Sequence, residues 1–142
     1  LEQSGPRLVK DRTSGTFVTG DASLLGRMAG NLLSNASLYS PDGAEIRVWC
    51  GLLDGRPTLT VENTGVYISD EALPHLFEAF YRAEGSRNRA TGGSGLGLYL
   101  VKMILARHGA ECTIENTRDG VRAAVRFETD AVSGLAAGDM IG

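Results

Sequence analysis

The spacing of apolar residues changes along the chain, and each spacing predicts a different element. From residue 22 to 39 apolar positions recur every three or four residues, which predicts an amphipathic helix with Asp21 as its N-cap. The apolar positions of this helix are Leu24, Leu25, Met28, Leu32, Leu33 and Ala36. A second helical pattern runs from 96 to 107, and His108 with Gly109 is expected to end it.

Alternating patterns predict two strand hairpins. Residues 46–50 and 58–63 alternate between apolar and polar positions, and so do residues 111–116 and 121–127. The turn residues are Asp54 and Gly55 in the first hairpin and Arg118, Asp119 and Gly120 in the second. Strands in one layer and helices in the other predict an α/β sandwich.

Two shorter elements are also expected. Residues 16–19 read as a short strand before the first helix. Ser69 begins a polar stretch that caps a short helix over residues 73–80, in which Phe77 and Phe80 are expected to anchor the core.

Length and composition indicate one globular domain. At 142 residues and 15.0 kDa, we expect a domain at 16–128, a linker or N-terminal extension at 1–15 and a flexible tail at 129–142. The formal net charge of −3 gives no reason to expect nucleic acid as a partner. Cys50 and Cys112 lack metal-ligand spacing and read as reduced core thiols, which suits the cytoplasm. No apolar run has the length of a membrane span, so we expect no contact with membrane.

The glycine-rich loop at 92–98 is the first sign of chemistry. Glycines let the backbone approach an anion, and the helix that follows presents free N–H groups and its positive dipole end. Leu98 and Tyr99 follow Gly97 where a P-loop needs Lys and Ser or Thr. The charged residues at 82–91 leave no strand before the loop, which disfavours a dinucleotide fingerprint.

Two carboxamides on the first helix are the second sign. Asn31 and Asn35 are four residues apart, so both project from one face, beside the apolar stripe. Partly buried amides need partners, which neighbouring backbone or a bound ligand or metal would supply.

Four segments in order resemble the boxes of sensor histidine kinases. Residues 31–40 resemble the N box, 61–68 the G1 box, 76–82 the F box and 92–98 the G2 box. The resemblance implies the catalytic, ATP-binding domain of the GHKL superfamily in a bacterial two-component sensor. It implies a Bergerat-type fold, with a mixed sheet packed on one face by about three helices. Residues 87–89 and the helix after the G2 box are most similar to sensors that control glycopeptide resistance.

The resemblance also implies roles for the two amides. Asn35 would coordinate Mg²⁺ that bridges the phosphates of ATP, and Asn31 would lie near the γ-phosphate. One amide oxygen together with phosphates and water suits this hard cation. Related gyrase-type ATPases carry a water-activating glutamate where Asn31 stands. Because an amide takes no proton, hydrolysis should be poor and transfer to a histidine favoured.

Further nucleotide contacts are implied by the matching positions. They are Tyr39, Asn63, Gly65, Ile68, Arg82, Arg87, Arg89, Gly93, Ser94, Gly95, Leu96, Gly97 and Leu98. Among these, Arg87 is also expected to stabilise charge during transfer. The alternatives are a half-buried helix-end tyrosine at Tyr39 and solvated surface arginines.

Three positions depart from the family pattern. Asn63 replaces the aspartate that usually recognises the adenine amino group, Tyr67 replaces a glycine, and Leu38 replaces a basic residue. These departures leave the affinity for nucleotide open.

The histidines complete the expected function. His75 and His108 both read as structural, and neither lies in the segment that sensor kinases phosphorylate. We therefore expect this chain to bind Mg-ATP and to phosphorylate a histidine on a separate dimerisation domain, and through it a response regulator. The alternatives are a nucleotide-binding regulatory module with weak or no catalysis and a stand-alone GHKL ATPase.

Overall fold

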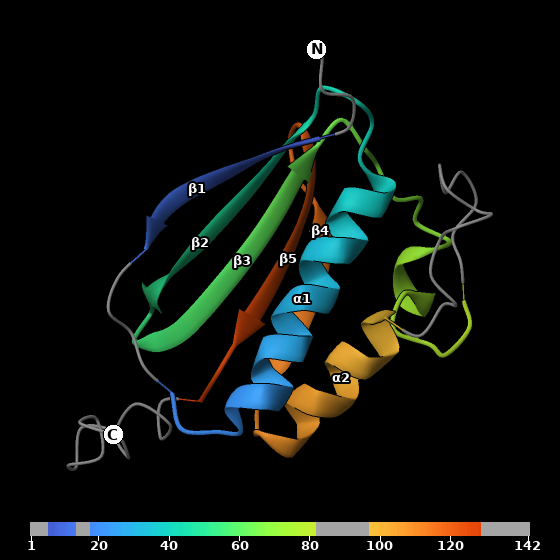
Figure 1. The fold of residues 1–142 in the computed structure, drawn as a ribbon. Helices are drawn as coiled ribbons and strands as arrows, with labels where there is room; N and C mark the ends of the chain where they lie inside the picture. Colours follow the sequence, from blue (N-terminus) through green and yellow to red (C-terminus); the bar gives the residue numbers. More distant parts are fainter. Residues whose placement is uncertain (1–5, 14–17, 82–96, 129–142) are drawn as a thin grey trace.

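A computed structural model describes residues 6–13, 18–81 and 97–128 as a two-layer α/β sandwich. Five strands form one sheet in the order β1-β2-β3-β5-β4, and both α-helices cover one face of it (Figure 1). The elements are β1 (Arg7–Thr13), α1 (Ala22–Tyr39), β2 (Glu45–Leu53), β3 (Arg56–Thr64), the 3₁₀ turn η1 (Leu73–His75), α2 (Gly97–Arg107), β4 (Glu111–Asn116) and β5 (Gly120–Arg126). The sheet is mixed, because β1 pairs parallel with β2 and the other pairs are antiparallel. The expected fold class is confirmed.

Local signals in the sequence place the helix ends and the first hairpin correctly. Asp21 caps α1, since its side chain accepts a hydrogen bond from the backbone N–H of Leu24 at 3.0 Å. Asp54 and Gly55 join β2 to β3 with φ angles of 54° and 76°, as a two-residue hairpin turn requires. Gly109 follows α2 with a φ of 65°, the left-handed conformation that ends helices.

The first strand differs from the prediction. β1 occupies Arg7–Thr13, inside the segment expected to be a linker, whereas residues 18–19 are not in a strand and 14–17 lie outside the described residues. Four of the seven residues of β1 are charged, which hides the alternation of a strand. Such residues are tolerated because, among the described strands, β1 lies at the edge of the sheet and pairs with β2 alone.

The segment after β3 also differs from the prediction. The α-helix expected at 73–80 is a single 3₁₀ turn at Leu73–His75, and the N–H groups of Leu76 and Glu78 bond to carbonyls three residues back rather than four. Phe77 packs against the core as expected. Phe80 does not: it is 70% exposed and has a φ of 68°.

The core lies between the helices and the inner face of the sheet. Its buried members are Met28, Leu32, Ala36, Ile46, Val61, Leu98, Val101, Ile104, Leu105, Ala123, Val125 and Phe127. Helices α1 and α2 supply one side of it and strands β2, β3 and β5 the other. In the part of the chain that the structure describes, neither helix is long and apolar enough to cross a membrane.

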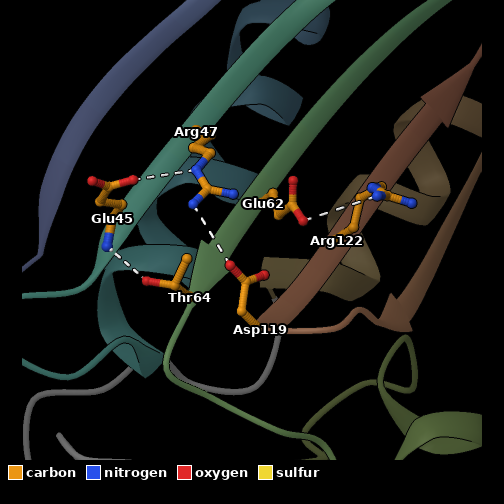
Figure 2. A network of polar contacts seen from close by, with 6 residues as sticks. All are labelled: Glu45, Arg47, Glu62, Thr64, Asp119 and Arg122. Atoms are coloured by element: carbon orange, nitrogen blue, oxygen red, sulfur yellow. Dashed lines mark hydrogen bonds and ion pairs between the residues drawn. The ribbon is translucent and has the colours of Figure 1, made fainter.

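The outer face of the sheet carries alternating charges. Arg47, Glu62, Arg122 and Glu115 occupy one row across β2, β3, β5 and β4. Arg122 lies 3.9 Å from Glu62, and Arg47 lies 3.7 Å from Asp119 (Figure 2). Arg122 also lies 3.1 Å from Glu115. Each exposed pair contributes at most about 1 kcal/mol. If one strand shifted its pairing by one residue, apolar side chains would enter this row. The row of charges therefore supports the strand register that places the inner-face residues.

Candidate nucleotide site

A cavity of about 670 Å³ opens between α1, the sheet and the start of α2. Its walls come from four parts of the chain: α1, the inner face of β3, β4 and β5, the segment after β3, and the first turn of α2. The lining residues are Leu32, Asn35, Ala36, Tyr39, Val61, Asn63, Val66, Tyr67, Ile68, Ser69, Glu71, Ala72, Leu76, Tyr81, Gly97, Leu98, Ile114, Val121 and Ala123. A cavity of this size whose lining combines apolar side chains with polar groups is typical of a small-molecule site.

Helix α1 brings Asn35 to the cavity, whereas Asn31 is not among the residues that line it. Leu32 and Ala36 are buried in the core, and Asn35, between them, lines the cavity. Asn31 lies one turn before Asn35 on the same face. Its Nδ2 is buried and finds no hydrogen-bond partner among the described residues. An unpaired buried donor costs free energy, and a negatively charged ligand atom would relieve that cost.

Asn63 is held at the floor of the cavity by Ser40. Its Nδ2 donates to the Ser40 Oγ at 2.9 Å, and that hydroxyl donates to the Ala36 carbonyl at 2.7 Å. A carbonyl only accepts, so the hydroxyl proton points to Ala36 and the hydroxyl oxygen faces the Asn63 amide. Ser40 is 0% exposed and Asn63 6%. Ser40 therefore fixes the orientation of the Asn63 amide: Nδ2 binds the protein, and Oδ1 is left to accept a hydrogen bond.

Gly65 does not line the cavity, but it sets the direction of the segment that does. It leaves β3 with a φ of 79°, and a Cβ there would lie 2.9 Å from the Cγ of Pro41. Its N–H donates to the Asp119 carbonyl at 2.9 Å. These contacts turn the chain so that Ile68 and its neighbours close the cavity.

Asn116 is a site residue that the sequence did not single out. Its side chain binds the backbone of Ile68 through two hydrogen bonds, of 2.9 Å from the Ile68 N–H and 2.8 Å to the Ile68 carbonyl. Ile68 in turn lines the cavity. The residue type alone, at the end of a predicted strand, gives no signal of this role.

The remaining predicted residues fall into two groups. Tyr39, Gly97 and Leu98 line the cavity, the latter two at the N-terminus of α2, where backbone N–H groups favour anions. Seven predicted contacts lie outside the described residues: Arg82, Arg87, Arg89, Gly93, Ser94, Gly95 and Leu96.

Both histidines make local contacts. The Nδ1 of His75 lies 2.8 Å from the Glu78 carboxylate, and its ring lies 5.4 Å from that of Tyr81. The Nε2 of His108 accepts the Asp21 N–H at 3.0 Å, and its Nδ1 lies 2.9 Å from the Ile104 carbonyl. His108 thus joins the end of α2 to the start of α1.

The two cysteines are free thiols, as expected. Burial raises the pKa of Cys112 to about 12, and burial also raises the pKa of Cys50. Both thiols therefore stay protonated at neutral pH.

A known protein family matches most of the chain. Residues 20–132 match the family described as Histidine kinase-, DNA gyrase B-, and HSP90-like ATPase. The sensor protein VanSB of Enterococcus faecalis is 38% identical over 120 residues, 84% of this chain and 27% of the relative. The sensor histidine kinase CusS of Escherichia coli is 44% identical over 105 residues, 74% of this chain and 22% of the relative. The chain thus spans about a quarter of the length of these curated relatives.

Solved structures agree with this assignment. The mycobacterial sensor histidine kinase MprB superposes with a TM-score of 0.76 at 27% identity, over 86% of this chain and 82% of that one. The catalytic domain of the histidine kinase ThkA, at 21% identity, shares the fold with a TM-score of 0.71 over 88% of this chain and 78% of that one. The chain belongs to the histidine kinase-, DNA gyrase B- and HSP90-like ATPase family, as the catalytic ATP-binding domain of a sensor histidine kinase.

Proposed function

We propose that this chain binds Mg-ATP in the cavity and supplies the γ-phosphate to a histidine on a separate dimerisation domain. The observation that carries the proposal is the buried Nδ2 of Asn31, which has no hydrogen-bond partner among the described residues and lies one turn from the cavity-lining Asn35. A buried donor without a partner in the described part of the chain, one turn from a cavity-lining residue, fits an anionic group such as a phosphate. Asn63, with its acceptor oxygen, stands on the sheet at the base of the same cavity and fits an amino group of a purine.

The residues present fit a magnesium ion. Asn35 offers an amide oxygen, a hard ligand, and the ion usually takes its other ligands from phosphate and water. Asn35 would hold the ion, which when bound neutralises charge on the phosphates.

The chemistry assigned to the protein is positioning. Asn31 would hold a terminal phosphate oxygen by donating from Nδ2, and its amide has no basic site to take a proton from water. Phosphoryl transfer needs alignment and charge stabilisation more than a protein nucleophile. An amide at this position therefore favours transfer over hydrolysis. Arg87, outside the described residues, would add charge stabilisation.

The proposal includes the partners and the setting. The dimerisation domain carries the acceptor histidine and passes the phosphate to a response regulator, and the chain forms the cytoplasmic part of a membrane-anchored sensor. A regulatory nucleotide-binding module is the second candidate, favoured by Asn63 and by Tyr67, which lines the cavity and is 70% exposed.

A phosphotransfer assay tests the proposal. The chain is mixed with the dimerisation domain of its parent sensor and γ-labelled Mg-ATP, and label is followed on both proteins. We expect acid-labile phosphate on the dimerisation domain alone, lost in Asn35→Ala and kept in the control Ser34→Ala, an exposed position on the same helix. Bound ATP without label on either protein would favour the regulatory module.

A further inference from the structure

Asn116, the last residue of β4, fixes the loop that follows β3. Its Oδ1 accepts the Ile68 N–H at 2.9 Å and its Nδ2 donates to the Ile68 carbonyl at 2.8 Å. A carboxamide carries one acceptor and one donor group side by side, so it satisfies both backbone groups of a single residue at once. Because β5 lies between β3 and β4, these bonds tie the loop to a strand two places away in the sheet.

The strand register relates Asn116 to Asn63. Val121 on β5 pairs with Asn63 on one side and with Asn116 on the other, so the three residues form one row. Ile114 lines the cavity and lies two residues before Asn116, which places both on the inner face. Asn116 therefore sets the distance between the loop at Ile68 and the amide of Asn63.

The two bonds also decide what Ile68 presents to the cavity. Backbone N–H and C=O groups near an apolar surface need partners, and without Asn116 those of Ile68 would draw water to this wall. With both groups satisfied, Ile68 offers its apolar side chain, which suits the flat face of a purine.

We propose that Asn116 is a positioning residue for the base-binding half of the nucleotide site, an inference that rests on the function proposed above. Asn116 holds Ile68 and Asn63 at a fixed spacing, so that the base meets an apolar wall and an acceptor together. Binding of the triphosphate, at Asn31 and the start of α2, does not depend on the two hydrogen bonds between Asn116 and Ile68.

Calorimetry with ATP and with inorganic triphosphate, both in magnesium, separates the two halves. The variants are Asn116→Ala, which removes both bonds, and Asn116→Asp, which keeps the shape and replaces the donor with an acceptor facing the Ile68 carbonyl. The control is Glu115→Gln, which exchanges a carboxylate for an amide at the neighbouring residue, on the outer face of the sheet. All titrations are made well below the melting temperature of each protein.

We expect both Asn116 variants to bind ATP about tenfold more weakly, while their affinity for triphosphate changes less than about twofold. The control should bind both ligands like the parent. Unchanged ATP affinity in both variants would overturn the role of Asn116, and so would an equal loss for ATP and triphosphate, which indicates a purely structural residue. A parent that binds triphosphate but gains nothing from the base would overturn the inference, whereas a parent that binds neither ligand would overturn the proposed function itself.

Discussion

Removing the Ser40 hydroxyl should weaken both the fold and the site. Ser40→Ala deletes the donor to the Ala36 carbonyl and the acceptor for the Asn63 Nδ2, two bonds of 2.7 and 2.9 Å at a position with 0% exposure. A hydrogen bond contributes about 1 kcal/mol net, and a buried donor left unpaired costs about 1–3 kcal/mol. We therefore expect the free energy of unfolding to fall by about 2 kcal/mol. The melting temperature should fall by about 8 °C.

Ser40→Ala should also weaken the binding of ATP. With its partner gone, the Asn63 amide must be ordered by the nucleotide, which costs about 1 kcal/mol, or about fivefold in ATP affinity. A double-mutant cycle of Ser40→Ala with Asn63→Ala, followed by chemical denaturation, measures the bond itself. We expect a coupling energy of about 1 kcal/mol.

The control is Ser34→Ala, the same substitution at an exposed position of α1, expected to change stability by less than about 0.5 kcal/mol. The reasoning would be refuted if Ser40→Ala and Asn63→Ala were additive within about 0.3 kcal/mol. A Ser40→Ala protein that melts like the parent would refute it as well.

Three further predictions concern the base, a buried thiol and hydrolysis. Asn63→Asp should tighten ATP binding and sharpen the preference for ATP over GTP, because a carboxylate makes a charge-assisted hydrogen bond to the adenine amino group. The Ser40 hydroxyl can turn to donate to the new carboxylate. Titration of both nucleotides checks this prediction, and unchanged affinities would contradict it. The raised pKa of Cys112 predicts that stability is fully present below pH 9.0 and is lost as pH rises toward about 12, since the thiol ionises first in the unfolded chain. Denaturation across this range should show the parent losing about 1.4 kcal/mol per pH unit more than Cys112→Ala, and parallel curves would contradict the burial of the thiol. The pure chain in Mg-ATP should gain no acid-labile phosphate and release phosphate near background, because Asn31 lacks a basic group; rapid release abolished by Asn35→Ala would favour an ATPase.

Local patterns were enough to predict most of the fold. The helix at Ala22–Tyr39 and the hairpin around Asp54 and Gly55 follow from spacing and turn residues that neighbours in sequence determine. Strand β1 was missed because its charged residues become a strand only by pairing with β2. The helix expected after Ser69 is one 3₁₀ turn, because the N–H groups that follow it bond three residues back, which the apolar spacing does not reveal.

The candidate site could be predicted only in part. Asn31 and Asn35 stood out because helical spacing and a family motif both point to them. Ser40 and Asn116 did not stand out, since their partners lie 23 and 48 residues away in the sequence. Contacts of this kind depend on strand order and register, which no local pattern contains.

Titration of ATP into the parent and Asn35→Ala, each in magnesium and in EDTA, tests the site most directly. Asn35 lines the cavity and supplies the one side-chain ligand assigned to the ion. We predict that Asn35→Ala melts like the parent, that it binds ATP about tenfold or more weakly in magnesium, and that it binds nearly as well as the parent in EDTA. A variant that melts normally and binds Mg-ATP as tightly as the parent would contradict the account.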